Sequence, residues 1–145
     1  MAIFSKTCEY AIRAVFYIAQ KTPSGERVGI KDIALGIDSP ELYLGKILQE
    51  LSRKGLISSA KGPNGGFYLS EEMLALPLIE VVRALDGEAL FTGCGLGLKQ
   101  CSEINPCPLH NEFKDIRNKI GLMLKRTTIG SFNRELMDGL LSLKK

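Results

Sequence analysis

The sequence lacks long hydrophobic runs. No stretch of 18 or more apolar residues occurs, so no segment reads as a membrane-spanning helix. Lys6, Glu9 and Arg13 interrupt the apolar part of the N-terminus, unlike the uncharged core of a signal peptide. We therefore expect a cytoplasmic protein.

Histidine and cysteine are scarce, with one histidine and four cysteines among 145 residues. In a reducing cytoplasm, four cysteines are weak support for disulfides, and clustered thiols are better read as metal ligands or redox groups. The chain also has no internal repeat, low-complexity tract or phosphate-binding loop. Its content of 45% hydrophobic and 24% charged residues is typical of a globular protein with one core, or of a small domain with an appended arm.

The net charge of +3 is small but unevenly placed. Residues 1–70 carry nine Lys/Arg and six Asp/Glu, whereas residues 71–145 carry ten of each. The whole excess of positive charge lies in the first half, which suits a surface that binds nucleic acid.

Apolar residues at helical spacing predict several helices. One covers residues 7–20, and a short second helix covers 30–35, which we expect Gly36 to end. A further helix runs from Pro77 to Asp86 and ends at Gly87. A long helix near the C-terminus carries a narrow apolar seam of the kind that meets another helix, formed by Phe113, Ile116, Ile120, Met123 and Thr127.

The helix after residue 38 has the clearest pattern. Ser39 is expected to cap it and Pro40 to take its first position, while Gly55 supplies a left-handed C-terminus. Its apolar stripe consists of Leu44, Ile47, Leu48 and Leu51. Two short β-prone runs then flank KGPNGG, which predicts a β-hairpin with an exposed tip.

Two helices joined by a tight turn and followed by a hairpin have the order of a winged helix-turn-helix. The second of the two helices would enter the major groove of DNA, and the hairpin tip would reach the adjacent minor groove. The candidate DNA contacts are Ser39, Glu41, Tyr43, Lys46, Gln49 and Arg53 on the helix, with Lys61 and Asn64 on the hairpin. The alternative is a set of packed helices whose polar face is simply solvated.

We expect a mainly α fold with a small β-hairpin wing and a long C-terminal dimerisation helix. Residues 1–76 would form the winged helix-turn-helix domain. Residues 77–145 would contain a helix, a cysteine loop at 91–110 and the dimerisation helix.

Three cysteines and the only histidine follow the spacing Cys94-x6-Cys101-x5-Cys107-x2-His110. Such a donor set can bind an iron–sulfur cluster or zinc. The stretch lacks the paired C-x2-C knuckles that are usual for zinc, and its glycines leave amide groups free to bond sulfur, which favours a cluster. The alternative is a loop of unligated thiols. Cys8 lies on the apolar stripe of its helix and is expected in the core.

The run IKDIALGIDSPELYLGKILQELSRKGLISSAKGPNGGFYL, with LIEVVRALDG downstream, closely resembles the Rrf-two family of bacterial winged-helix transcriptional regulators. The family includes IscR-, NsrR- and CymR-like branches, and the likeness extends from EYAIRA to the long C-terminal helix. It implies double-stranded DNA as partner and a homodimer whose long helices cross through Phe113, Ile116, Ile120 and Met123. Gly45 and Lys61 depart from the IscR-like pattern of an acidic residue and an arginine, so the operator sequence does not carry over.

The resemblance also implies an iron–sulfur cluster that controls DNA affinity, because cluster-binding members carry three cysteines at this place. It favours [2Fe–2S] over [4Fe–4S], with zinc less favoured, although one extra residue between Cys94 and Cys101 leaves the cluster type open. His110 matches the Cys-x-x-His ending of the family motif. Glu9 lies where other branches use a carboxylate from the partner subunit as fourth ligand, and we favour His110.

Three other functions stay open. The protein could be a regulator that uses thiol oxidation or zinc, or one that is controlled by a protein partner. An enzyme with Cys107 as nucleophile and His110 as base explains only one of the three cysteines and has no second catalytic carboxylate, so we expect no enzyme.

Overall fold

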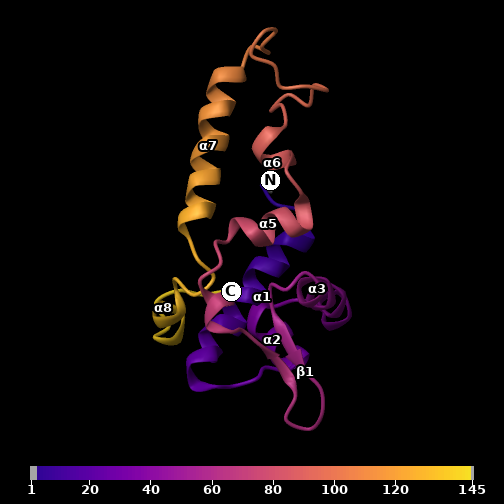
Figure 1. Cartoon of the computed structure of the whole chain (residues 1–145), viewed down its shortest axis with the longest axis vertical. Helices are drawn as coiled ribbons and strands as arrows, with labels where there is room; N and C mark the ends of the chain where they lie inside the picture. The colour runs from indigo at the N-terminus through magenta and orange to yellow at the C-terminus, as the bar shows by residue number, and fades with distance from the viewer. Residues whose placement is uncertain (1–2, 145) are drawn as a thin grey trace.

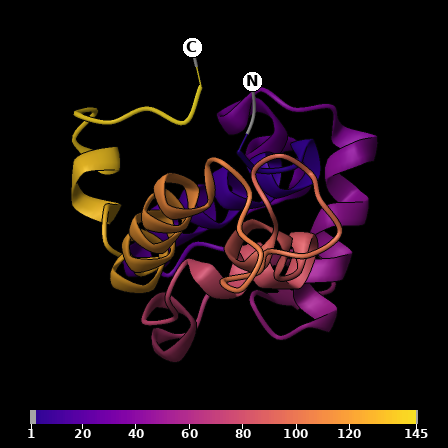
Figure 2. The same ribbon diagram turned by 90° about the horizontal axis from the view of Figure 1, so that it is seen from above.

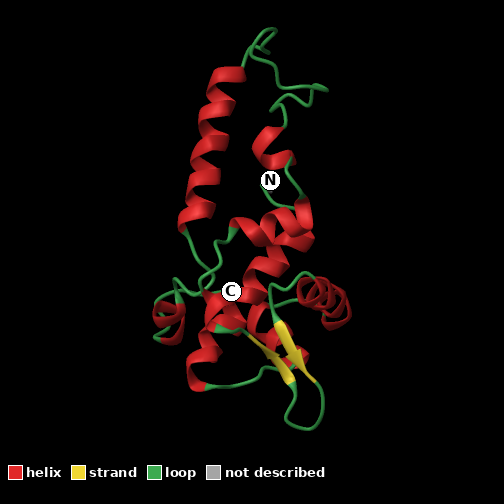
Figure 3. Ribbon diagram, viewed as in Figure 1, coloured by secondary structure: helices red, strands yellow, loops and turns green. Residues whose placement is uncertain are grey.

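The computed structural model describes residues 3–144. Its elements are α1 (Lys6–Lys21), the 3-10 helix η1 (Thr22–Ser24), α2 (Ile30–Ile37), α3 (Glu41–Arg53), β1 (Ser58–Ala60), β2 (Gly66–Tyr68), α4 (Glu71–Leu74), α5 (Ile79–Asp86), α6 (Ala89–Thr92), α7 (His110–Arg126) and α8 (Asn133–Met137). Helices dominate, and the antiparallel β1–β2 hairpin is the sheet of the described region (Figure 3). The predicted mainly α fold with a hairpin wing is therefore confirmed.

The elements are spread along one long axis. The hairpin lies at the bottom of Figure 1, and the loop between α6 and α7 lies at the top, beside the upper end of α7. Figure 2 shows the same molecule from above, with α3 and α8 on opposite sides of α1. No helix in residues 3–144 is long and apolar enough to cross a membrane.

One buried cluster joins the helices of the winged region to the later part of the chain. Helix α1 contributes the central residues, and Cys8 is fully buried among them as predicted. Leu78, Val81, Leu124 and Ile129 belong to the same cluster, although they follow residue 76 in the sequence. The boundary at residue 76 stays a prediction, and the core draws on both sides of it.

The prediction that Gly36 ends the second helix is wrong. Helix α2 continues through Gly36 to Ile37, and Asp38 terminates it with a left-handed φ of 55°. The Tyr17 ring of α1 occupies the space that a Cβ at position 36 would need. Gly36 therefore serves the close packing of α1 on α2, since the absent side chain makes room for the ring.

The start of α3 also differs from the prediction. Pro40 is the N-cap residue and Glu41 is the first helical residue, so Pro40 lies one position earlier than expected. Ser39 does not cap the helix; its hydroxyl instead contacts the Pro40 carbonyl at 3.5 Å. At the other end Gly55 has the predicted left-handed conformation, with φ of 75°.

The wing is a hairpin with an added edge. Ser58 pairs with Tyr68 and Ala60 with Gly66, so the tip consists of residues 61–65 and is one residue shorter than the predicted KGPNGG, because Gly66 begins β2. Val28, between η1 and α2, forms an isolated bridge to Phe67 through hydrogen bonds of 2.9 and 2.8 Å. The segment before α2 thus lies against the wing, which the sequence pattern did not indicate.

The later helices match the predictions in kind, with shifted ends. Helix α5 begins at Ile79 rather than Pro77, because Pro77 forms a bridge with Thr128. Helix α7 ends at Arg126, so Thr127 is an extended cap residue and not part of the helical seam. The short helices α4, α6 and α8 were not predicted. Phe132, just before α8, stacks edge-on against Phe16 of α1 with ring centroids 5.9 Å apart.

Candidate nucleic-acid interface and metal centre

Helix α3 presents a polar face to solvent because its apolar stripe is buried in the core. Leu44, Ile47, Leu48 and Leu51 are buried, as the periodicity predicted. The side chains on the other face are exposed or half-exposed, and they include Ser39 and Glu41 at the N-terminal end and Lys46, Gln49 and Arg53 further along. A helix packed in this way offers its outer face to a DNA groove.

Two of the candidate α3 contacts already have partners within the protein. The Tyr43 hydroxyl shares a hydrogen bond with the Thr7 hydroxyl, and its ring packs edge-on against Tyr10 with centroids 5.6 Å apart. Arg53 forms an ion pair with Glu50 one turn earlier. Tyr43 is therefore oriented by α1, and Arg53 would have to leave an exposed ion pair, which is a weak interaction, to reach DNA.

Both wing-tip residues that were predicted to contact DNA are accessible to solvent. Lys61 and Asn64 are exposed. Arg27 lines an open hollow of about 530 Å³ together with Asn64 and stacks over the Tyr68 ring at 5.1 Å. Sequence reasoning missed Arg27, because only the bridge between Val28 and Phe67 brings it to the wing. It adds a second cationic side chain to this edge of the molecule.

The three loop cysteines and His110 lie close together as two pairs. The sulfur atoms of Cys94 and Cys107 are 3.8 Å apart, and the Cys101 sulfur is 3.3 Å from His110 Nδ1. Among the described residues, no group of three or more Cys, His, Asp or Glu is arranged to hold a metal ion. The loop therefore brings the four predicted ligands into one region without placing all four around a common point.

Several N–H groups point at the sulfur atoms. The Leu96 amide donates to Cys94 Sγ at 3.4 Å, and Arg117 Nη2 of α7 donates to Cys101 Sγ at 3.3 Å. Hydrogen bonds from the backbone amides of Leu96 and Leu98 lower the pKa of the Cys94 thiol from its ordinary value. Such donors stabilise a thiolate, which is the form that binds a metal.

His110 is buried at the start of α7, and its Nε2 atom has no hydrogen-bond partner. The nearest acidic oxygen, from Glu103, is 3.8 Å away, which is too long for a hydrogen bond. Glu103 instead bonds Lys114, which lowers the pKa of its carboxyl. A buried imidazole nitrogen without a partner is unusual in a protein, and it is the kind of atom that a bound group would satisfy.

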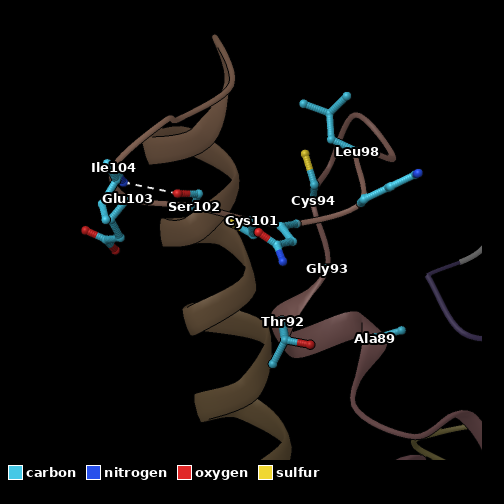
Figure 4. A pocket seen from close by; sticks show the side chains of 11 residues that line it. Ala89, Thr92, Gly93, Cys94, Leu98, Cys101, Ser102, Glu103 and Ile104 are labelled. Carbon is cyan, nitrogen blue, oxygen red and sulfur yellow. Dashed lines mark hydrogen bonds between the residues drawn. The ribbon is translucent and has the colours of Figure 1, made fainter.

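An open pocket of about 640 Å³ lies between α6 and the loop (Figure 4). Cys94, Cys101 and Glu103 line it, and Figure 4 shows them beside the ribbon of α7. The alternative ligand Glu9 lies on α1, where it forms an ion pair with Lys6 at 3.5 Å.

Helix α7 has one face toward the rest of the protein and an apolar seam beside it. His110, Gly121 and Leu124 form the buried face. Of the predicted seam, Ile116 is 51% exposed and Met123 is 46% exposed, while Ile120 and Phe113 are half-buried. The Phe113 ring occupies the space that a Cβ on Gly95 would need, so Phe113 also covers the cysteine loop.

Comparison with known protein families matches residues 4–135 to Rrf2, described as an iron-dependent transcriptional regulator. The chain belongs to the Rrf2 family. It is 33% identical over 129 residues to an HTH-type transcriptional regulator of Aquifex aeolicus, and the match covers 88% of each protein. It is 28% identical over 131 residues to the HTH-type transcriptional regulator IscR of Escherichia coli, which covers 89% of this chain and 80% of IscR.

Solved structures show that the Rrf2-family fold is shared as well. CymR, the global cysteine regulator of B. subtilis, has a TM-score of 0.73 at 22% identity, with 92% of this chain and 97% of CymR covered. IscR of T. potens has a TM-score of 0.71 at 20% identity, covering 95% of this chain and 90% of that one. This Rrf2-family chain is thus a DNA-binding transcriptional regulator of winged-helix fold, and not an enzyme.

Arg117 is the residue of the cysteine region that sequence reasoning missed. Its guanidinium reaches both Cys101 Sγ and the carbonyl oxygen of Gly93, just after α6. Position 117 is two turns after His110 on the face of α7 that points toward α6, which is the only sequence signal for its role. In this Rrf2-family protein Arg117 therefore holds the loop against α7 through two hydrogen bonds.

Proposed function

We propose that the protein is a homodimeric transcriptional regulator whose affinity for DNA is controlled by an iron–sulfur cluster bound by Cys94, Cys101, Cys107 and His110. The observation that carries this proposal is the gathering of three thiols and the only histidine into two contacting pairs at one end of α7. The description of the family as iron-dependent agrees with it.

The donor set suits such a cluster chemically. Thiolates with one imidazole ligate iron–sulfur centres, and hydrogen bonds to the sulfur atoms tune them. The unpartnered His110 Nε2 and the N–H donors of Leu96 and Arg117 fit that environment. The two pairs must close on each other for all four residues to bind together. We favour [2Fe–2S] over [4Fe–4S], with zinc less favoured, and Glu9 of the partner subunit as the alternative fourth ligand.

The loop is placed where a change in it would reach the DNA-binding surface. It connects α6 to α7, and Arg117 joins its two sides. At the far end of α7, Leu78 N–H donates to Thr127 O at 2.7 Å, and Ile129 is buried in the core with α1. When bound, the cluster would supply a link between the two donor pairs and a centre that gains or loses electrons. A shift of the α7 start would alter the seam and thus the spacing of two α3 helices.

DNA binding would use the faces described above. We propose that α3 enters the major groove and the wing reaches the minor groove. The contacts are Ser39, Glu41, Tyr43, Lys46, Gln49 and Arg53 on α3 and Lys61 and Asn64 on the wing. The dimer would form through Phe113, Ile116, Ile120 and Met123, whose exposed or half-buried apolar groups need a partner surface.

An absorbance spectrum of anaerobically purified protein, with iron and sulfide assayed on the same sample, tests the cluster. Matched iron and sulfide with a visible charge-transfer band are expected, and their ratio to protein distinguishes two irons from four. The same protein before and after removal of iron is then titrated with operator DNA selected from a random pool. Equal affinity of both forms would refute the control of DNA binding by the cluster.

A second candidate is a regulator that senses oxidants through its thiols without iron. The contact of 3.8 Å between the sulfur atoms of Cys94 and Cys107 favours it. Colourless protein without iron, whose DNA affinity changes with thiol oxidation, would support this candidate over the first. Zinc in place of iron, or a co-purifying metabolic enzyme, would indicate a zinc staple or control by a protein partner.

A further inference from the structure

The three thiols of the cysteine loop have different surroundings. Cys94 follows α6 by two residues and Cys107 precedes α7 by three, yet their sulfur atoms are 3.8 Å apart. The segment between them contains no helix or strand, and residues 95–100 and 103–106 are exposed. The two ends of the loop are therefore brought together at these two sulfurs, while the middle of the loop projects into solvent.

Cys101 is engaged elsewhere. Its sulfur contacts His110 Nδ1 at 3.3 Å and accepts from Arg117 Nη2 at 3.3 Å. Arg117 is also bonded to the Gly93 carbonyl, so it is fixed at two points. These contacts hold the Cys101 sulfur against α7.

We infer that, when the loop holds no cluster, Cys94 and Cys107 form a disulfide on exposure to hydrogen peroxide while Cys101 stays reduced. In the first step one thiol of the pair takes an oxygen from peroxide, which gives a sulfenic acid and one water. The second thiol then attacks that sulfur, the S–S bond forms, and the hydroxyl leaves with the thiol proton as a second water. Two thiols lose two electrons and two protons, and one peroxide is reduced to two waters.

The geometry requires only a small movement. An S–S bond is about 2.0 Å long, so the two sulfurs must approach by roughly 1.8 Å. Gly97, in the left-handed conformation at φ of 75°, and the exposed backbone on either side can absorb such a shift without disturbing the core. Forming a bond to Cys101 would instead break its contacts with both His110 and Arg117.

The disulfide would occupy two of the four proposed ligands, so the oxidised protein could not load a cluster until a thiol reductant restored it. This consequence rests on the function proposed above, whereas the selectivity of the disulfide does not. Cluster-free protein with reduced thiols could then accept a cluster, whereas cluster-free protein oxidised under oxidative stress could not.

The test uses full-length protein that is stripped of iron with a chelator, reduced, freed of reductant and treated with hydrogen peroxide. Free thiols are blocked with N-ethylmaleimide, and the products are mapped by mass spectrometry without reduction. Trypsin cuts after Lys99 and Lys114, which leaves Cys101 and Cys107 on one peptide. A glutamate-specific protease is therefore added, because cleavage after Glu103 separates them.

A linked peptide pair joining Cys94 to Cys107, with Cys101 alkylated, is expected as the major product. A major product that contains Cys101, or oxidation beyond sulfenic acid without any disulfide, would overturn the inference. Cys101→Ser is the matched control, since it removes a thiol of the same loop and should form the linked pair to the same extent. Cys107→Ser should form none. Iron and sulfide assays on the protein before stripping report on the cluster separately, so the two proposals can fail independently.

Discussion

At the wing end of the molecule α3 rests on buried leucines, whereas at the cysteine end the loop leaves its apolar side chains in water. Leu44, Leu48 and Leu51 are fully buried, but Leu98 is 55% exposed and Ile104 is 89% exposed. An apolar side chain that stays in water contributes no burial energy to hold its segment in place. The outer face of α3 is thus held in place by the protein's own core, while the cysteine loop has no core of its own.

The cysteine end relies instead on a few polar contacts. Arg117 bonds Gly93 and Cys101, and Cys101 contacts His110. A hydrogen bond of this kind contributes about 1 kcal/mol net, so the loop belongs to the part of the structure that opens at low free-energy cost. The difference between the ends suits a regulator in which one end reads DNA and the other responds to a bound group.

The largest effect is expected when a proposed cluster ligand at the cysteine end is removed. Cys101→Ala should lose most of its iron and sulfide, because even changes next to metal ligands lower affinity about 10- to 100-fold. Its unfolding free energy without iron should fall by only about 1 kcal/mol, since the change removes polar contacts with Arg117 and His110 but no core packing. Iron and sulfide assays and urea unfolding measure the two effects. Cys8→Ala is the control and should keep its iron; equal loss in both variants would exclude a specific site in the loop.

The next effect concerns α7, which joins the two ends. The double variant Ile116→Glu, Ile120→Glu should be monomeric, because dimerisation would bury its charged carboxylates in the seam without a partner. DNA affinity should fall by about 100-fold or more when two half-sites are no longer bound together. Light scattering and DNA titration measure this. Asp115→Lys, a charge change elsewhere on α7, should stay dimeric. A dimer that persists in the double variant would contradict the seam.

A smaller effect is expected at the wing end. Lys46→Ala should weaken DNA binding by about 10-fold and reduce the slope of log affinity against log salt by about 1 for each protomer, because one phosphate contact is lost. Its iron content should be unchanged. Lys99→Ala removes an exposed lysine from the cysteine loop and should leave DNA affinity unchanged. Equal losses in both variants would show that overall charge, not the α3 surface, sets the affinity.

The smallest expected effect is a dependence of stability on pH that comes from Cys8, the thiol buried in the core, rather than from the loop thiols. Burial raises the pKa of Cys8 to about 12 from an ordinary 9.0, and the negative charge of Asp86 adds to this. The unfolded chain therefore loses this proton first as pH rises. The resulting stability is present below pH 9 and is lost between pH 9 and pH 12.

Urea unfolding at pH 7, 9 and 10 tests whether the free energy of unfolding falls as pH rises above 9. The difference in unfolding free energy between wild type and Cys8→Ala should shrink by about 1 kcal/mol from pH 9 to pH 10. Val15→Ala, on the same helix as Cys8, removes no titratable group, so its difference from wild type should stay constant over the same range. A constant difference between wild type and Cys8→Ala would mean that the thiol is not shielded in the folded protein.

The helices and the hairpin were largely predictable because their signals are local. The stripe of α3, the left-handed Gly55 and the turn at residues 61–65 depend on neighbours in the sequence. Gly36 was misjudged for the opposite reason. A glycine inside an apolar pattern looks like a stop, and only the ring of Tyr17, from another helix, shows why α2 passes through it.

The sequence by itself determined the order of the longer helices and the hairpin, the family and the set of candidate donors in the cysteine loop, since periodicity, turn residues and spacing are written along the chain. Only the tertiary structure decided which sulfur faces which, that Arg117 reaches Cys101, and that Arg27 joins the wing. These pairings join residues that are far apart in the chain or on separate elements. Their geometry follows from how the helices pack on one core, and no local pattern encodes it.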